Sequence, residues 1–397
     1  MNDAGLEQAA NPVRVLHLNS ALAGGGTDDQ CVKLVQGLHR AGQPVWLAGR
    51  VDTALAPLIR QLELPFLPIS RLGVLKTTFI LEAARWIRRH KIQIVHGHHG
   101  RDIWPTILAA RLSGVRPKIV LTRHLAKSPA SWPSRQFLLS QCDALVAVSN
   151  FVAHVLRDGD YDPESPVAER RSRPPMRGDH SRIHVIYGGM DTDRFRPMES
   201  SPLRAEWGLQ PGDYAFAMVG GYYLPVGKGQ REFLQAAGQV HTAIPNARFL
   251  LVGNGDMAEL LRADIQRLGL TGKAWLTPYC RDMPQAMNAI DCLVHSQIGT
   301  EAMAGVIMEA HACGRPVIAS NLDGLPEALA IGGGYGQLVR PGSVDELAAA
   351  MRRQAFAAKA TEGERLAMHR RVAQNFSLDQ SAQNHRLLYS KLLPRLL

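Results

Sequence analysis

The hydrophobic pattern of the first half of the chain alternates between short apolar runs and longer amphipathic segments. Short apolar runs bounded by polar turns predict buried parallel strands, and amphipathic segments predict helices. The predicted strands are residues 13–18, 45–47, 92–95, 120–121, 144–148 and 185–187. The predicted helices are a segment ending at Arg40 and residues 54–62, 74–89 and 103–112. This alternation predicts a doubly wound parallel sheet, whose ligands bind beyond the carboxyl ends of the strands.

The second half of the chain repeats this alternation. Its predicted strands are residues 214–219, 249–252, 292–295 and 317–319. One predicted helix ends near Val240, and another starts near Val306. Two further predicted helices cover residues 343–358 and 378–392. Gly314 fits a helix end and Pro316 prevents the helix from continuing, so the next strand begins directly afterwards. A chain of 397 residues is long enough for the two domains that this pattern implies.

The stretch between the two halves, residues 158–181, has a different composition. It is rich in Arg, Pro, Asp, Glu and Ser and has too few apolar residues to form a core. We expect a mobile surface loop there.

Overall composition narrows the class of protein. No apolar run approaches the roughly 20 residues that span a bilayer, and we expect no signal peptide in residues 1–11. The five cysteines have no metal-type spacing, which favours a reduced, cytoplasmic setting. Lys and Arg number 45 against 35 Asp and Glu, which predicts an acidic partner. No nucleic-acid recognition module is visible, so an acidic saccharide or anionic lipid fits better.

Two glutamates, Glu301 and Glu309, flank the most informative turn. Glu301 follows a predicted strand, and Glu309 lies inside the helix that starts near Val306. A strand, a small-residue turn and a helix N-terminus form a phosphate site, because unpaired N–H groups point into the turn. Carboxylates beside such a site suit sugar hydroxyls better than the phosphate, which repels them. A phosphate flanked by sugars describes a nucleotide sugar.

This segment also carries a family resemblance. Residues 301–313, followed by Gly-Arg-Pro-Val-Ile-Ala-Ser at 314–320, resemble the donor-site signature of the retaining glycosyltransferases of family 4. The resemblance extends over nearly the whole chain and implies the GT-B fold, an α/β architecture of two Rossmann-like domains facing across a cleft. It implies an N-terminal, acceptor-side domain at 1–195 and a donor-side domain at 196–377. Residues 378–397 would form a terminal helix that packs back on the first domain.

The resemblance assigns expected roles on the donor side. Lys228 and the backbone amides around residues 303–306 would stabilise the departing diphosphate. Glu301 would hold the donor sugar, and Glu309 would hold the ribose. Tyr279 and Arg281 fall in the segment that holds the nucleobase in family members. Other expected donor-side residues are Gly220, Asn254, Met303, Ala304, Gly305 and Val306.

The chain departs from the family pattern at one place. Family members carry Gly-Arg and then, a few residues later, Pro-x-Lys-Gly. This chain has Lys228 and its glycine, but Gly221 or Tyr222 stands in place of the arginine, and the loop is slightly longer. Arg231 lies inside the following helix and is not an obvious substitute.

The first domain contributes a glycine loop and histidines. Gly25 and Gly26 let backbone approach a ligand closely, and in family 4 this loop faces the donor phosphate; a merely tight turn is the alternative. Thr27 suits the N-cap of the helix that follows. His124 resembles the family histidine that reaches toward the donor sugar, although a structural histidine fits the same position.

Three histidines, His96, His98 and His99, raise the question of a zinc site. No nearby cysteine or carboxylate completes a convincing ligand set, and family 4 chains often carry His-x-His here. We therefore expect neither a metal nor any other cofactor.

A membrane face is suggested near residues 85–91. Four cationic side chains accompany Trp86 and His90, while a separate apolar stripe remains for the core. Basic helices with exposed aromatic residues can lie on anionic lipid. A solvated helix face is the alternative.

The predicted function is sugar transfer from a nucleotide diphosphate sugar to a saccharide or lipid-linked acceptor, with retained anomeric configuration. Family analogy favours bacterial lipopolysaccharide or exopolysaccharide assembly, in the cytoplasm or at the inner face of its membrane. Two alternatives remain: a non-catalytic nucleotide-sugar-binding protein and a nucleotide-sugar 2-epimerase of the same fold.

Overall fold

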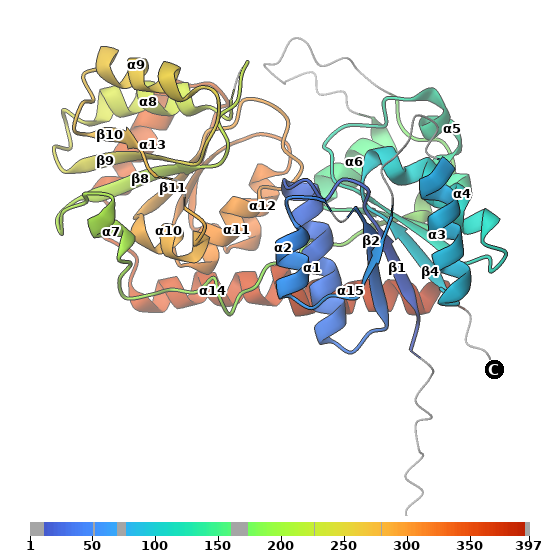
Figure 1. Ribbon diagram of the computed structural model, residues 1–397. Coiled ribbons are helices and arrows are strands. Elements are labelled where there is room, and N and C mark those ends of the chain that lie inside the picture. The colour runs from blue at the N-terminus through green and yellow to red at the C-terminus, as the bar shows by residue number, and fades with distance from the viewer. Residues whose placement is uncertain are drawn as a thin grey trace, which may run out of the picture.

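The computed structural model describes residues 12–50, 52–69, 77–159, 174–225, 227–278 and 280–393. Figure 1 shows two lobes, each built around one parallel sheet with helices on both faces. This architecture confirms the predicted pair of doubly wound, Rossmann-like domains. No helix within the described ranges combines the length and the apolar character needed to cross a membrane.

The first domain holds a seven-stranded parallel sheet of order β3-β2-β1-β4-β5-β6-β7. Its strands are β1 (Val15–Leu18), β2 (Val45–Gly49), β3 (Phe66–Pro68), β4 (Ile94–Gly97), β5 (Lys118–Arg123), β6 (Ala144–Ala147) and β7 (Ile183–Val185). One face is covered by α1 (Gly26–Arg40), α2 (Ala56–Gln61) and the terminal helix α15 (Leu378–Leu392). The other face is covered by α3 (Thr77–Arg89), α4 (Ile103–Leu112), α5 (Trp132–Gln141) and α6 (Asn150–Asp158). Short 3-10 helices occupy Gly100–Asp102 and His180–Arg182.

The second domain holds a six-stranded parallel sheet of order β10-β9-β8-β11-β12-β13. Its strands are β8 (Tyr214–Val219), β9 (Ala247–Val252), β10 (Ala274–Leu276), β11 (Cys292–His295), β12 (Val317–Ser320) and β13 (Gly336–Val339). One face is covered by α10 (Met283–Ala289), α11 (Gly305–Ala312), α12 (Leu325–Ile331) and α14 (Glu362–Phe376). The other is covered by α8 (Gln230–Val240), α9 (Ala258–Arg267) and α13 (Val344–Phe356), and α7 (Leu203–Glu206) lies near the domain entry.

Two chain segments cross between the domains, and they are bound to each other. Met190 in the outgoing segment accepts the N–H of Leu378 and donates its own N–H to Phe376, both at 3.0 Å. The return segment is α14 and α15, which run along the bottom of both lobes in Figure 1. Helix α15 packs closely on α1, because a Cβ at Gly37 would lie 2.7 Å from the carbonyl oxygen of Leu378. The second crossing is therefore helical on both sides of Ser377 and packs on the first domain through α15.

The domains also touch above the crossings, at the N-terminus of α6. Glu327 of α12 accepts hydrogen bonds from the backbone N–H groups of Asn150 and Phe151 at 2.8 and 3.1 Å. The hydroxyl of Tyr187 donates to the same carboxylate at 2.7 Å. A carboxylate at a helix N-terminus complements the helix dipole. This contact holds the two lobes together across the upper part of their junction.

Some elements were missed from the hydrophobic pattern. Strand β3 is only three residues long, and α14 buries Met368, Val372 and Phe376, a stripe too narrow to indicate an amphipathic helix. The prediction for Thr27 was wrong: α1 begins at Gly26 with Gly25 at the N-cap and no side-chain cap.

The predicted surface loop at residues 158–181 is described only at its two ends, and residues 160–173 lie outside the described residues. At the second of these ends, Met176 is buried in the first-domain core, and its N–H donates to Leu156 at 2.9 Å.

Buried histidines gather where α15 meets the first sheet. His17 of β1 and His96 of β4 are register partners on adjacent strands. The Nδ1 of His17 lies 2.8 Å from the Nε2 of His98. The ring nitrogens of His96 lie 2.7 Å from the Tyr389 hydroxyl of α15 and 2.6 Å from the Thr122 hydroxyl. The docking of α15 therefore depends on a polar network under its apolar face.

Acid should destabilise the protein through these histidines. Burial lowers the pKa of His17 to about 3 and that of His385, on α15, to about 4, so both are neutral in the folded chain at neutral pH. An unfolded histidine, with a pKa of about 6.5, binds a proton below that pH. The unfolded state therefore binds more protons from about pH 6.5 down to 4, and the free energy of unfolding falls in that window. Urea unfolding at pH 7 and pH 5 should show a loss of up to about 2 kcal/mol per buried histidine.

A matched pair of variants assigns this loss. His385→Gln removes one titrating group and should reduce the loss between pH 7 and pH 5. His39→Gln, at the exposed end of α1, should leave the loss unchanged. If the free energy of unfolding of His385→Gln fell between pH 7 and pH 5 by as much as that of the wild type, the assignment would be contradicted.

Candidate active site

The carboxyl ends of the second-domain strands bring distant segments to one edge. Gly220 follows β8 and donates its N–H to Val252, at the end of β9, at 2.9 Å. A Cβ at Gly253 would lie only 2.1 Å from the carbonyl oxygen of Gly220, so the backbones of the two turns are in close contact. Asn254 follows directly and is exposed. Because the strands are parallel, the segment after β11 reaches the same edge.

Lys228 and Glu301 meet at this edge. The Lys228 Nζ lies 3.6 Å from the Glu301 Oε2, although the residues come from the turns after β8 and β11. Lys228 is fixed by Gly229, which has φ 90° and where a Cβ would lie 1.9 Å from the carbonyl oxygen of Ser296. An ion pair this exposed contributes at most about 1 kcal/mol. An arriving phosphate can therefore take the lysine away from the glutamate at little cost.

The turn after Glu301 leads into an open helix N-terminus. The Glu301 N–H donates to Asp323 Oδ2 at 3.1 Å, and the Gly324 N–H donates to the Glu301 carbonyl oxygen at 3.1 Å. Ala304 is the N-cap of α11 and provides no side-chain cap, while Gly305 has open space where a side chain would lie. The first amides of an α-helix have no intrahelical partner. They can bind an anion placed beside Lys228. Met303 and Val306 border this turn and are half-buried.

Glu309 lies farther along α11, beside the first domain. Burial raises the pKa of its carboxyl to about 7, although the Lys33 ammonium favours the ionised form. Lys33 belongs to α1, where it pairs with Asp29 at 2.7 Å. Both residues belong to the first-domain helix that follows the glycine loop. Their proximity to Glu309 was missed from the sequence, because it depends on how the domains face each other.

The glycine loop of the first domain is open. Gly25 and Gly26 are exposed, with open space where a Cβ would lie. The loop is held from below by Asp28, which accepts the Ala23 N–H and the Asn19 amide, both at 2.9 Å. Since no side chain caps α1, its first amides are free to meet a ligand.

His124 lies in a separate cavity of the first domain. Its Nε2 is buried and has no hydrogen-bond partner in the described part of the chain. Burial lowers the pKa of the ring to about 3, so it is neutral. The cavity measures about 20 Å³, room for one water molecule. The lining of this cavity includes neither Lys228 nor Glu301. Ala302, directly after Glu301, belongs to the first-domain hydrophobic cluster that includes Ala126, and its carbonyl oxygen accepts the Ser149 hydroxyl at 2.8 Å, so the Glu301 turn contacts the first domain.

The residues near the position where family members carry an arginine have other contacts. Arg231 pairs with Asp264 at 2.8 Å and therefore does not replace the missing arginine. Tyr222 is buried, and its hydroxyl donates to Gly253 at 3.0 Å. Arg281 is exposed. Tyr279 lies outside the described residues.

The histidines considered for zinc are grouped differently from the sequence prediction. His17 joins His96 and His98, with one ring nitrogen of each lying within 4.8 Å of the others. His99 is separate, and its Nδ1 accepts the N–H of Arg101. Both nitrogens of His96 already have partners, so ligation would require it to release one of them. The arrangement fits a hydrogen-bonded network better than a metal ligand set.

Comparison with known proteins places this geometry in a family. A family model described as "Glycosyltransferase Family 4" matches residues 24–168, and one described as "Glycosyl transferases group 1" matches residues 213–355. The D-inositol 3-phosphate glycosyltransferase of Rhodococcus erythropolis is 31% identical over 327 residues, which cover 77% of this chain and 70% of that protein. The UDP-Gal:alpha-D-GlcNAc-diphosphoundecaprenol alpha-1,3-galactosyltransferase of Escherichia coli is 26% identical over 251 residues, 62% of each chain.

The match to another relative is shorter. The D-inositol 3-phosphate glycosyltransferase of Segniliparus rotundus is 35% identical over 158 residues, but the match covers only 34% of that protein.

Solved structures show the same fold at low sequence identity. A glycosyltransferase from Rickettsia africae superimposes with a TM-score of 0.79 at 20% identity, covering 97% of this chain and 100% of that one. Anabaena HepE in complex with UDP and glucose superimposes with a TM-score of 0.75 at 20% identity, covering 95% and 99%. With the two family models and the Rhodococcus relative, these likenesses show that the chain belongs to glycosyltransferase family 4 and has the GT-B fold.

Proposed function

We propose that the protein transfers a sugar from a nucleotide diphosphate sugar to an acceptor hydroxyl in the cleft between its domains. The observation that carries the proposal is the convergence of Lys228, Glu301 and the α11 N-terminus at one sheet edge. Two positive elements and one carboxylate match a diphosphate attached to a sugar. HepE, which shares the fold, is bound to UDP and glucose in one structure and to UDP-glucose in another.

In the proposed reaction the bond between the anomeric carbon and the diphosphate oxygen breaks. The acceptor oxygen bonds to the same face of that carbon, and its proton passes to the departing phosphate oxygen, so configuration is retained. Lys228 and the amides of Gly305 and Val306 stabilise the negative charge that grows on the diphosphate. Glu301 accepts hydrogen bonds from the donor sugar. These contacts accelerate transfer only insofar as they strengthen as the bond breaks. No metal is required, since the chain supplies the positive charge.

His124 and the glycine loop complete the cleft from the first domain. Gly25 and Gly26 offer backbone near the phosphates, and His124 acts on the donor sugar or the acceptor. The His124 Nε2 is buried in a cavity, so this role requires the ring or its loop to turn toward the cleft when substrate binds. Substrate-induced rearrangement of loops is common in enzymes that exclude water from the reaction.

The proposed acceptor is a saccharide or lipid-linked saccharide of bacterial lipopolysaccharide or exopolysaccharide assembly, in the cytoplasm. The named substrate of the Escherichia coli relative is a diphosphoundecaprenol-linked sugar, and another relative is the putative glycosyltransferase EpsD of Bacillus subtilis. A lipid-linked acceptor would bring the protein to an anionic membrane surface.

Helices α3 and α4 are the proposed membrane face. Arg85 and Arg89 are exposed on α3, and Leu81 on the same helix is 52% exposed. On α4, Leu112 is 56% exposed. Trp86, the aromatic residue expected on this face, is half-buried and donates its indole N–H to Pro68 at 3.3 Å. The leucines add exposed apolar surface beside it.

Two alternatives are separable by experiment. A non-catalytic nucleotide-sugar-binding protein would bind the donor tightly without transfer or hydrolysis. A 2-epimerase would release an epimerised sugar or nucleotide sugar without an acceptor. Binding across a panel of UDP-, GDP- and ADP-sugars, followed by product analysis, distinguishes all three.

Lys228→Ala should lower the rate of transfer about 10²–10³-fold, the usual cost of losing one preorganised group at a developing negative charge. The effect should appear in kcat as well as in kcat/KM. Arg231→Ala, three residues along and paired with Asp264 away from the site, should keep the wild-type rate. Full activity in Lys228→Ala would remove the lysine from the mechanism.

Donor binding should strengthen from pH 6 to pH 8. The pKa of Glu309 is about 7, so the carboxylate that accepts ribose hydroxyls predominates only above that pH. Calorimetry with a nucleotide sugar measures this without titration of the ligand, because each of its phosphates carries one ester and one anhydride bond and has no second ionisation in this range. Glu309→Gln should bind about tenfold more weakly at pH 8 and lose most of the pH dependence. An unchanged pH profile in Glu309→Gln would contradict the assignment to the ribose.

The protein should co-sediment with anionic vesicles, and not with neutral ones, at low salt. The double variant Arg85→Glu/Arg89→Glu should bind at least tenfold more weakly, since each basic residue near the surface contributes about 1 kcal/mol. Arg262→Glu, exposed on α9 of the other domain, is the control. No binding of the wild type at low salt would end the membrane proposal.

A further inference from the structure

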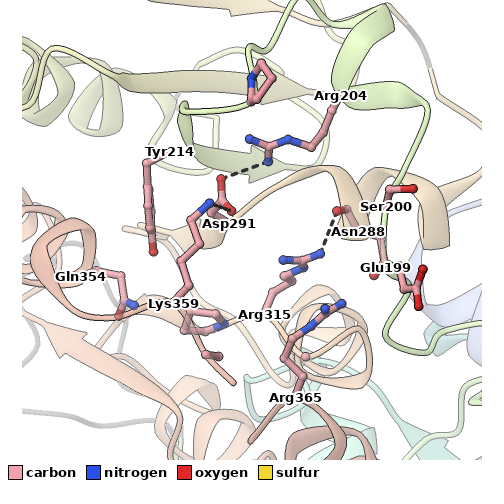
Figure 2. A pocket seen from close by; sticks show the side chains of 14 residues that line it. Glu199, Ser200, Arg204, Tyr214, Asn288, Asp291, Arg315, Gln354, Lys359 and Arg365 are labelled. Carbon is pink, nitrogen blue, oxygen red and sulfur yellow. Dashed lines mark hydrogen bonds and ion pairs between the residues drawn. The ribbon is translucent and has the colours of Figure 1, made fainter. Parts of the chain in front are cut away.

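A second pocket lies at the opposite edge of the second-domain sheet from Lys228. It has a volume of about 280 Å³ and is shown in Figure 2. Tyr214 begins β8, Asp291 directly precedes β11, and Pro316 directly precedes β12, so the pocket is at the amino ends of these strands. Strand β8 alone spans six residues. At about 3.3 Å per residue, the pocket is on the order of 15–20 Å from the Lys228 edge. It is not part of the donor site.

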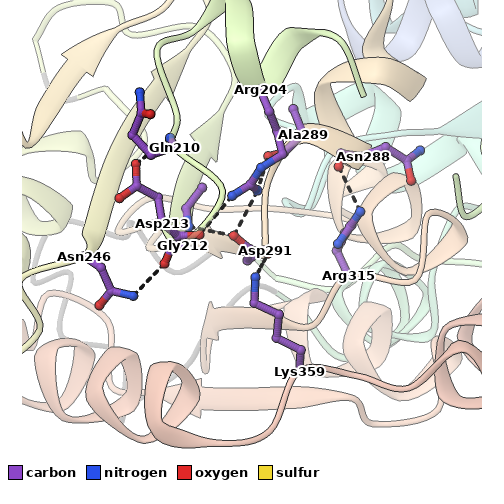
Figure 3. A network of polar contacts seen from close by, with 11 residues as sticks. Arg204, Gln210, Gly212, Asp213, Asn246, Asn288, Ala289, Asp291, Arg315 and Lys359 are labelled. Carbon is purple, nitrogen blue, oxygen red and sulfur yellow. Dashed lines mark hydrogen bonds and ion pairs between the residues drawn. The ribbon is translucent and has the colours of Figure 1, made fainter. Parts of the chain in front are cut away.

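Four cationic side chains line this pocket, namely Arg204, Arg315, Lys359 and Arg365. Two of them share one buried carboxylate: Asp291 pairs with Arg204 at 3.0 Å and with Lys359 at 3.0 Å (Figure 3). Asp291 also accepts the Ala215 N–H at 2.8 Å, so both of its oxygens have partners. This group of contacts ties β8 to β11, and neither of the other two arginines pairs with Asp291 at close range.

Arg315 and Arg365 form no close ion pair among the described residues. Within the described residues, neither has a carboxylate within 4.0 Å. One Nη2 donates to the Asn288 carbonyl oxygen at 2.8 Å, and the other donates to that of Met198 at 2.7 Å. The Nε of each guanidinium is buried and has no hydrogen-bond partner in the described ranges. The remaining lining carboxylate, Glu199, is on the exposed rim.

The two guanidinium groups repel each other. Burial and the neighbouring Arg365 lower the pKa of Arg315 to about 10. Carbonyl contacts alone could hold the adjacent loops in place, but each uses one N–H group of a guanidinium that offers five. Asp291 favours the charged form of Arg315 only from beyond ion-pair distance, and burial still disfavours it, so this charge is costly. An anion in the pocket would remove this cost.

We infer that this pocket is a binding site for a phosphate group. Two guanidinium groups present planar N–H forks, which bind phosphate oxygens in bidentate fashion, and Lys359 adds a point charge. A carboxylate would carry too little charge for this number of cations. The volume falls just below the roughly 300 Å³ at which drug-sized ligand sites begin, and fits inorganic phosphate, pyrophosphate or the phosphate of a small ester.

The location gives the site a mechanical consequence. Arg204 follows the outgoing crossing, Arg365 is in the first turn of α14 on the return crossing, and Arg315 precedes β12 in the body of the domain. In Figure 2 these three side chains surround the same space. A bound phosphate would therefore join the segment after the outgoing crossing and the start of α14 to the body of the second domain.

Calorimetry on the full chain at constant ionic strength tests the site, with inorganic phosphate, pyrophosphate and glucose 6-phosphate as probes. The Lys228→Ala variant serves as background, because it weakens phosphate binding in the donor cleft. At least one probe should bind the Lys228→Ala variant with the same affinity as it binds the wild-type protein. Adding Arg315→Gln or Arg365→Gln should weaken binding at least tenfold. Arg353→Gln, exposed on α13, should have no effect.

The outcomes separate the sources of the phosphate. Equal binding of all three probes indicates the free anion, and binding of the ester alone indicates a phosphorylated metabolite. Arg315→Gln could fail to fold, and Arg365→Gln then tests the inference, because Arg365 is half-exposed at the start of a helix. The Tm of the Arg365→Gln variant should no longer rise when the probe is added. Absence of binding to the Lys228→Ala background, or binding indifferent to both arginine substitutions, overturns the inference.

Discussion

The two domains are joined by two crossings that are hydrogen-bonded to each other, and this contact constrains the rest of the structure. Met190 exchanges backbone hydrogen bonds with both sides of Ser377, where α14 ends and α15 begins. A Cβ at Gly189 would lie 3.0 Å from the Ser377 carbonyl oxygen, so glycine eases the close approach of the two backbones. The two crossings are therefore bound together where they pass between the domains.

The same parallel sheet of the second domain carries different chemistry at its two edges. At the carboxyl edge, the start of α11 has no side-chain cap, and Lys228 forms a weak, partly exposed pair with Glu301, whose N–H donates to Asp323. At the amino edge, Asp291 and its two cations join strands, and two further arginines form no close ion pair among the described residues. The proposed ligand of the first edge must leave after reaction, whereas the phosphate inferred at the second edge would stay bound.

Features that are set by residues close together in the chain could be predicted from the sequence. Gly314 and Pro316 gave the end of α11 and the start of β12, and helix α15 was predicted with its observed bounds. Features that depend on strand register or on contacts between the domains could not be predicted from the sequence. His96 and His98 were grouped with their chain neighbour His99, whereas the structure groups them with His17, because β1 and β4 are adjacent. Sequence order cannot reveal which strand becomes the neighbour.

Glu309 connects the donor site to the constraint at the crossings. Its carboxyl is removed from water where α11 faces α1 of the other domain, near Lys33 and Asp29. If the domains separate, water returns to the carboxyl and its pKa falls toward the ordinary value of about 4.3. A group with a higher pKa in the closed form binds a proton more readily there, so protonation favours closure in the empty protein. In the proposed donor complex, a ribose hydroxyl that donates to the ionised carboxylate would replace this proton. The proposal thus couples closure and donor binding through one side chain at the face between the domains.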